Sequence, residues 1–178
     1  MKRIIISLLL LAPMYALGKE AMGAERIRTK LQEMKRLARD PRLAEDAETG
    51  SLTAQLFLAS AQGDFTAAED ILKNKSVSPN VTDSFGNTAL HYAKNLKMIK
   101  LLRKYGANLN AQNDDGIARL HMDVVLGRYF TIDYLLNNGA ETTLATQGGV
   151  TPLHLSTIIS YFSDPTDAAL VALGVESK

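Results

Sequence analysis

Hydrophobic and polar residues follow three different patterns along the chain. Residues 4–12 are almost wholly apolar, interrupted only by Ser7. From Glu20 to Asp40, apolar residues recur at helical spacing among charged ones, which predicts an amphipathic helix that ends before Pro41. From about residue 54 onward, short apolar stretches return at regular intervals, and this third pattern indicates an internal repeat.

The first pattern is typical of a secretory signal peptide. Lys2 and Arg3 precede the apolar run, Pro13 breaks it, and small residues follow at Ala16 and Gly18. The run is much shorter than the roughly 20 residues that span a bilayer, so a membrane helix is not expected. We predict a signal peptide over residues 1–18, with cleavage after Gly23 or Ala24 as alternatives.

The repeat is carried by four copies of one short motif. The copies begin at Ala54, Thr88, Ala118 and Thr151, with spacings of 34, 30 and 33 residues. The last three read TALHYA, ARLHMD and TPLHLS, and the weaker first copy reads AQLFLA. The first three copies are each followed by a second apolar stretch, at residues 67–72, 98–102 and 132–136.

These copies resemble the ankyrin-repeat family, whose motif T-P-L-H-x-A returns about every 33 residues. The resemblance covers about residue 52 to the C-terminus. It implies an all-α solenoid of helix–turn–helix units with β-hairpin-like loops. We place the repeats at residues 51–178, as about 54–87, 88–117, 118–150 and a degenerate or capping repeat at 151–174. Residues 19–50 are predicted to form an N-terminal helical cap, with a partner-binding helix as the alternative.

The family pattern assigns structural roles to the repeated residues. Leucines at positions 90, 120 and 153 are expected to point inward, and histidines at 91, 121 and 154 to hydrogen-bond the backbone of adjacent repeats. Thr88 and Thr151 are expected to cap helices. Glycines at 63, 127, 106 and 139 are expected to end helices in the left-handed conformation.

The second and third copies depart from the family pattern. The spacing of 30 residues predicts a tighter turn between the two helices of the second repeat, around Lys94–Lys97. Arg119 stands where the family has proline, a change that we expect to be tolerated. Asp123 stands where the family has a small buried alanine, so its carboxylate needs nearby donors, a local helix shift or a functional role.

Composition narrows the classes of function. The net charge is +1, and loss of Lys2 and Arg3 with the signal would leave 18 basic against 19 acidic residues, which does not favour nucleic-acid binding. The chain has no cysteine, so disulfides and thiolate chemistry are excluded. Basic residues between 26 and 39 are interleaved with acidic ones, as on a solvated helix face.

No residue pattern predicts catalysis, a cofactor or a metal site. Asp114-Asp115-Gly116 lacks the regular ligand spacing of a calcium loop and is better explained as a turn. Gly148-Gly149 lacks the lysine and the strand–helix frame of a phosphate-binding loop. The histidines occupy equivalent positions in successive repeats and are not expected to share a ligand.

The family grips proteins with its hairpin tips and inner helices, and we place the partner site by that correspondence. Several of the equivalent positions are unusually apolar here, and a contiguous exposed apolar patch often marks an interface. The alternative is that neighbouring segments cover this stripe. The predicted partner-binding residues are Phe85, Leu96, Asp114, Asp115, Ile117, Val125, Leu126, Gln147, Ile158 and Ile159.

The sequence thus predicts a monomeric, non-catalytic protein-interaction module in the periplasm or secreted, with no nucleic-acid partner and no stable membrane insertion after signal cleavage. The export signal favours a bacterial envelope, because eukaryotic members of the family are mostly intracellular. One alternative is an enzyme or metal-dependent activity centred near His121 and Asp123. Another is a structural subunit of an envelope assembly.

Overall fold

The computed structural model describes residues 23, 25–29, 32, 36, 51–73 and 77–156. The predicted signal peptide, most of the predicted cap and the end of the fourth repeat, including Ile158 and Ile159, lie outside the described residues. The named helices are α3 (Leu52–Gln62), α4 (Phe65–Lys73), α5 (Ala89–Tyr92), α6 (Leu96–Lys104), α7 (Arg119–Val125) and α8 (Tyr129–Asn137). A further helical segment spans residues 152–156.

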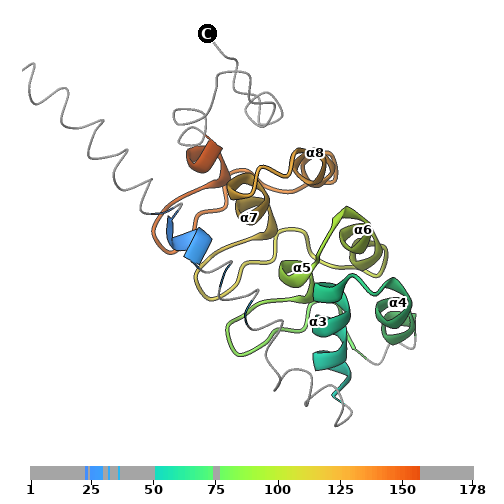
Figure 1. Ribbon diagram of the computed structural model, residues 1–178. Helices are drawn as coiled ribbons and strands as arrows, with labels where there is room; N and C mark the ends of the chain where they lie inside the picture. The colour runs from blue at the N-terminus through green and yellow to red at the C-terminus, as the bar shows by residue number, and fades with distance from the viewer. Residues whose placement is uncertain are drawn as a thin grey trace, which may run out of the picture.

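The helices form two layers. Helices α3, α5 and α7 line up in an inner row, α4, α6 and α8 form an outer row beside them, and the connecting loops extend on the other side of the inner row (Figure 1). Each inner helix is followed by the outer helix of its own repeat, so one antiparallel pair is stacked on the next. The predicted all-α solenoid is therefore confirmed.

The loops that join successive repeats are short hairpins. Isolated antiparallel bridges pair Thr82 with Thr88 and Gln112 with Ala118. Within these hairpins, the Asp83 amide donates to the Asn87 carbonyl at 3.0 Å, and the Asn113 amide donates to the Ile117 carbonyl at 3.1 Å. The expected β-hairpin-like loops are thus present, although no extended sheet forms within the described residues.

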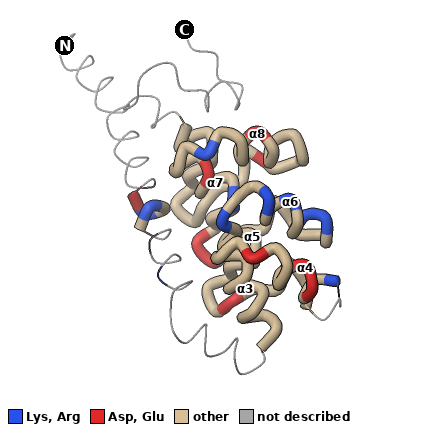
Figure 2. The backbone as a smooth tube through the Cα atoms, turned by 45° about the vertical axis from the view of Figure 1, so that its right-hand side comes forward, with Lys and Arg blue, Asp and Glu red and all other residues tan. Residues whose placement is uncertain are grey.

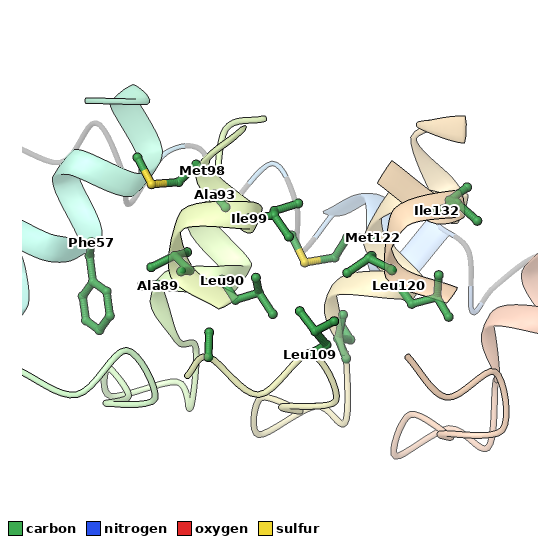
Figure 3. Packing of buried hydrophobic residues seen from close by; sticks show 14 of the residues in the cluster. Phe57, Ala89, Leu90, Ala93, Met98, Ile99, Leu109, Leu120, Met122 and Ile132 are labelled. Atoms are coloured by element: carbon green, nitrogen blue, oxygen red, sulfur yellow. The ribbon is translucent and has the colours of Figure 1, made fainter. Parts of the chain in front are cut away.

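A continuous apolar core fills the space between the layers. Leu90, Leu120 and Ile132 are at most 1% exposed, and the buried residues follow one another from repeat to repeat (Figure 3). The inward orientation expected for the first two leucines is confirmed. For Leu153 it is wrong, because this side chain is 41% exposed in the last described helical segment, where no further described repeat packs on it.

The second repeat is shortened in its inner helix. Helix α5 has four residues, compared with eleven in α3 and seven in α7. The turn that follows α5 contains residues 93–95 and is no shorter than the turn after α7, residues 126–128. The expected tighter turn is therefore wrong. The missing residues come from the end of the helix, because a helix can lose a turn without straining the connection.

The glycine and cap predictions hold for most positions. Gly63, Gly106, Gly127 and Gly139 all have positive φ angles, between 61° and 91°. Thr88 has the extended backbone of an N-cap residue. It acts together with His91, as described below.

The described part of the predicted N-terminal cap contacts the middle and the far end of the stack. Residues 25–29 are helical, and Ile27 is 2% exposed. Arg26 lies 3.5 Å from Asp115, and Gly23 lies against Val150. This segment runs beside the hairpin loops (Figure 1). The cap over residues 19–50 stays a prediction, because most of those residues lie outside the described ranges.

Candidate functional site

The repeated histidines join adjacent repeats. The backbone N–H of Thr88 donates to Nδ1 of His91 at 3.0 Å, so Nδ1 is the unprotonated acceptor and Nε2 carries the hydrogen. Nε2 then donates to the Ile117 carbonyl, 3.0 Å away in the next hairpin. His121 repeats the arrangement with the Ala118 amide at 3.1 Å and the Val150 carbonyl at 3.2 Å. The predicted structural role of these two histidines is confirmed.

Both buried histidines are held neutral. Burial lowers the pKa of His91 to about 4 and also lowers the pKa of His121, since a charged imidazole would lose its hydration. Protonation would in addition remove the acceptor at Nδ1. His154, in contrast, is exposed and contacts Thr151 in its own repeat.

Arg119 has a role that sequence reasoning missed. Its side chain is only 1% exposed, and Nη1 donates to the carbonyls of Leu90 at 2.9 Å and Ala93 at 2.7 Å. Those carbonyls lie at the end of α5, where the shortened helix leaves acceptors without the usual amide partners. The arginine in the place of proline therefore supplies the donors that the missing helical turn would have supplied.

Asp123 balances this buried charge. Its Oδ2 accepts from Nε of Arg119 at 2.8 Å, and its Oδ1 lies 3.6 Å from Nη1 of Arg128. Asp123 is fully buried. Because Arg119 and Arg128 lie beside its carboxylate, the expectation that it finds donors nearby is confirmed. The departures at positions 119 and 123 are thus two halves of one ion pair, one helical turn apart on α7.

Polar contacts also join the hairpins directly. Asn113 Nδ2 donates to Asn87 Oδ1 at 2.9 Å, with both side chains buried. The amide of Asp114 donates to the Phe85 carbonyl at 3.1 Å, and the amide of Gln147 donates to the Asp115 carbonyl at 2.9 Å. The repetition gives no signal for this pair, because Asn87 directly precedes its motif copy whereas Asn113 lies five residues before the next copy.

The side chains of the alternative site, His121 and Asp123, are not accessible to solvent. Both side chains are fully buried, so a substrate in solvent cannot reach them. Nor does any group of three or more His, Asp or Glu residues with the geometry to hold a metal ion occur in the described ranges.

The apolar stripe predicted for the partner site is interrupted. Ile117 is 3% and Val125 is 9% exposed, so both belong to the core, and their expected exposure is wrong. They are buried because they belong to the apolar cluster that runs through the stack. Leu96 is partly buried, whereas Leu126 is 36% exposed. The roles of Ile158 and Ile159 stay predictions.

The predicted hairpin-tip residues lie nearer the surface. Phe85 is 37% exposed, Asp114 and Gln147 are exposed, and Asp115 is partly buried. Because neighbouring tips are hydrogen-bonded to one another, these side chains stand on one ordered edge of the stack. The structure therefore brings together the tip residues but not the full apolar stripe.

A second apolar surface lies at the turn between α7 and α8. Phe130 is 85% exposed, and Tyr129 beside it is 40% exposed. Together with Leu126 they form what we call the α7–α8 patch. Within the described part of the chain, no other large hydrophobic side chain is as exposed as Phe130.

Comparing equivalent positions in the repeats would have revealed Phe130. Each outer helix begins with an apolar residue: Phe65 in α4, Leu96 in α6 and Tyr129 in α8. The next residue is Thr66 in the first repeat and Lys97 in the second, and both are exposed. Among the three repeats whose outer helices the structure describes, only the third places an aromatic residue at this solvent-facing position.

The charged side chains have a separate distribution. Helix α6 carries Lys97, Lys100, Arg103 and Lys104, all exposed, on the outer layer (Figure 2). Glu69 of α4 lies 3.2 Å from Lys104, and Lys100 lies over the ring of Tyr134 at 5.2 Å. Such surface pairs contribute little to stability. None of the helices in the described ranges combines the length and hydrophobicity needed to cross a bilayer.

Comparisons with known proteins agree with this architecture. The family model for ankyrin repeats in three copies matches residues 56–146, half of the chain. Human BCL-6 corepressor-like protein 1 is 38% identical over 88 residues, or 48% of this chain and 5% of that protein. Human inversin is 31% identical over 110 residues, 60% of this chain and 10% of that protein. The chain thus matches a small part of these relatives, and it belongs to the ankyrin-repeat family.

Proposed function

We propose that this protein is an exported, non-catalytic interaction module that binds a protein partner mainly through the α7–α8 patch. Ankyrin repeats are protein–protein interaction modules, which supports binding as the activity. The hairpin tips, with Phe85, Asp114 and Gln147, extend the proposed contact surface along the stack.

The observation that carries the proposal is the exposure of Phe130. An aromatic side chain that is 85% exposed gains little from folding, so its presence is not explained by the stability of the stack. Aromatic residues are enriched at protein interfaces, where burial of their large apolar surface provides much of the binding free energy. Leu126 and Tyr129 widen this surface.

The test compares two matched substitutions. Phe130→Lys gives the third repeat the residue found at this position in the second, and Thr66→Lys makes the same change in the first repeat. We expect Phe130→Lys to abolish partner capture from an envelope extract and Thr66→Lys to preserve it. Both should change the free energy of unfolding by no more than about 0.5 kcal/mol, as for other exposed sites.

A photoreactive amino acid identifies the partner directly. Placed at position 130 it should cross-link one protein species, and placed at position 66 it should not. Equal capture by the two lysine variants, or cross-linking at both positions alike, would contradict the proposed site.

The proposal of export rests on residues 1–18. We expect the chain recovered from the envelope or the medium of the producing cell to begin at residue 19, the cleavage position that keeps Gly23 in the mature chain. N-terminal sequencing of the recovered protein measures this, and a chain that retains Met1 and stays in the cytoplasm would contradict it. A structural role in an envelope assembly is the second candidate, and size-exclusion chromatography of a native extract separates it from a transient partner.

A further inference from the structure

A segment near the N-terminus of the chain lies on the surface beside the hairpins that contain Asp115 and Val150. Nη2 of Arg26 donates to Oδ1 of Asp115 at 3.5 Å. Ile27 is 2% exposed and belongs to the same buried apolar cluster as Ile117 and Val150. The helical segment 25–29 therefore places one basic and one branched apolar side chain on a face built by the repeats.

Gly23 brings the segment unusually close to this face. A Cβ atom added at Gly23 would lie 2.7 Å from Cγ2 of Val150, closer than side chains pack. Val150 is itself 5% exposed, so it has little room to move away. The glycine thus permits an approach that a larger residue would block.

Among the described residues 25–29, only Ile27 is buried. Glu25, Arg26, Arg28 and Thr29 are exposed, as are Gln32 and Arg36 farther along. The Arg26 side chain is 69% exposed, and an ion pair in that environment is weak. Among the described residues, the contact therefore depends on Ile27 and on the fit at Gly23.

We propose that residues 23–29 act as an intramolecular ligand of the surface formed by Asp115 and Val150, and that a partner docking on this surface displaces them. We expect the partner to present a helix that resembles the segment. That helix would carry a small residue in the place of Gly23, a basic residue in the place of Arg26 and a branched apolar residue in the place of Ile27. This inference rests on the proposed binding function for its purpose, but the intramolecular contact is tested without any partner.

The first measurement is the distance between the segment and the stack. The chain has no cysteine, so Thr29→Cys with Thr143→Cys gives a full-length protein labelled at two chosen exposed sites. We expect one narrow distance distribution by electron spin resonance. Ile27→Asp should broaden it, because a carboxylate is costly in an apolar site. Gly23→Leu should have the same effect.

A matched charge pair tests Asp115. Arg26→Glu should broaden the distance distribution, and adding Asp115→Arg should narrow it again. Arg28→Glu is the control, because the Arg28 side chain is also exposed, at 57% against 69% for Arg26, and pairs within its own helix with Glu25 at 3.7 Å. A distribution that none of these changes alters would overturn the proposal. So would a short distance between two singly labelled chains, which would assign the contact to a second copy.

The second measurement uses a fluorescent peptide of residues 20–36 added to the full chain. The Ile27→Asp chain, with its own segment released, should bind the peptide about tenfold more tightly than the unaltered chain, the factor expected if the segment occupies the surface in about nine molecules in ten. A peptide carrying Arg26→Glu should bind more weakly than one carrying Arg28→Glu. Equal binding to both chains, or none to either, would refute the inference, whereas a failed Phe130→Lys test would refute only the proposed function.

Discussion

At the scale of single residues, two departures from the family pattern are explained by one missing helical turn. Arg119 and Asp123 replace the expected proline and alanine and form a buried ion pair, with Nε and Oδ2 2.8 Å apart. Arg119 also binds the carbonyls of Leu90 and Ala93 at the end of the short helix α5. The pair therefore compensates for a deletion about 26 residues earlier in the chain.

Removing either member of this pair should be costly. We expect Arg119→Met to lower the free energy of unfolding by about 3–5 kcal/mol, because it leaves Asp123 buried without its partner. Restoring the family residues with Arg119→Pro and Asp123→Ala together should recover only part of the loss, since the Leu90 and Ala93 carbonyls lose the donor that Arg119 supplies. Urea unfolding of the two variants measures both values, and a loss below about 1 kcal/mol for Arg119→Met would contradict this account.

The buried histidines should make stability depend on pH. The pKa of His91 is about 4 in the folded chain and about 6.5 when unfolded, so the unfolded state binds more protons between these values. Stability is then fully present above about pH 6.5 and falls as the pH drops toward 4, by on the order of 3 kcal/mol from His91. The lowered pKa of His121 acts in the same direction.

Urea unfolding at pH 7.5, 5.5 and 4.5 measures this dependence. Carboxylates titrate in the lower part of the range as well, so the His91→Gln variant serves as the reference. It should be less stable at pH 7.5 but lose less stability on acidification. Parallel pH profiles for the two proteins would show that His91 is not the titrating group.

At the scale of elements, neighbouring hairpins pack closely against one another, and this packing limits which residues they can contain. Gly86 and Gly106 both have positive φ angles, 72° and 91°. At Gly86 an added Cβ would meet the Asp114 side chain and lie 2.8 Å from the Asp114 amide nitrogen, whereas at Gly106 nothing lies within 4 Å. The same conformation thus has different packing constraints in the hairpin and in the helix end.

This difference predicts unequal effects of the same substitution. Gly106→Ala should cost about 1–2 kcal/mol, the strain of a left-handed conformation alone. Gly86→Ala should cost more, because it also separates the hairpins and weakens the hydrogen bond from the Asp114 amide to the Phe85 carbonyl. Thermal or urea unfolding compares them directly, and equal losses would mean that the hairpins tolerate separation.

At the scale of the whole molecule, each repeat is stabilised mainly by its neighbours. The described core runs without interruption from Leu56 through Leu90 and Leu120 to Leu135, and the histidine bonds cross the junctions in the same direction. Stability is therefore transmitted step by step along the stack.

A destabilising substitution in the second repeat should weaken the adjacent repeats more than the distant ones. Leu90→Ala should cost about 2–5 kcal/mol, as expected for a buried leucine. Hydrogen exchange should show the largest loss of amide protection in α5, a smaller loss in α3 and α7, and the smallest in α8. Equal loss in every helix would indicate that the stack unfolds only as a single unit.

The sequence by itself determined the architecture. The spacing of the TALHYA-type copies, their leucines and histidines, and the helix-ending glycines predicted the helical stack correctly, because these features are local and return in successive copies. It also predicted that Asp123 needs nearby donors, because a buried carboxylate does so in any fold. The hairpin tips at Phe85, Asp114 and Gln147 followed from the same repetition.

Only the tertiary structure decided which side chains are left at the surface. Ile117 and Val125 belong to the buried apolar core, whereas Phe130 is 85% exposed. The structure likewise showed that Arg119 serves α5 and that Ile27 lies in the same apolar cluster as Val150. These contacts join residues 26 to more than 100 positions apart, and burial depends on such distant neighbours rather than on local sequence.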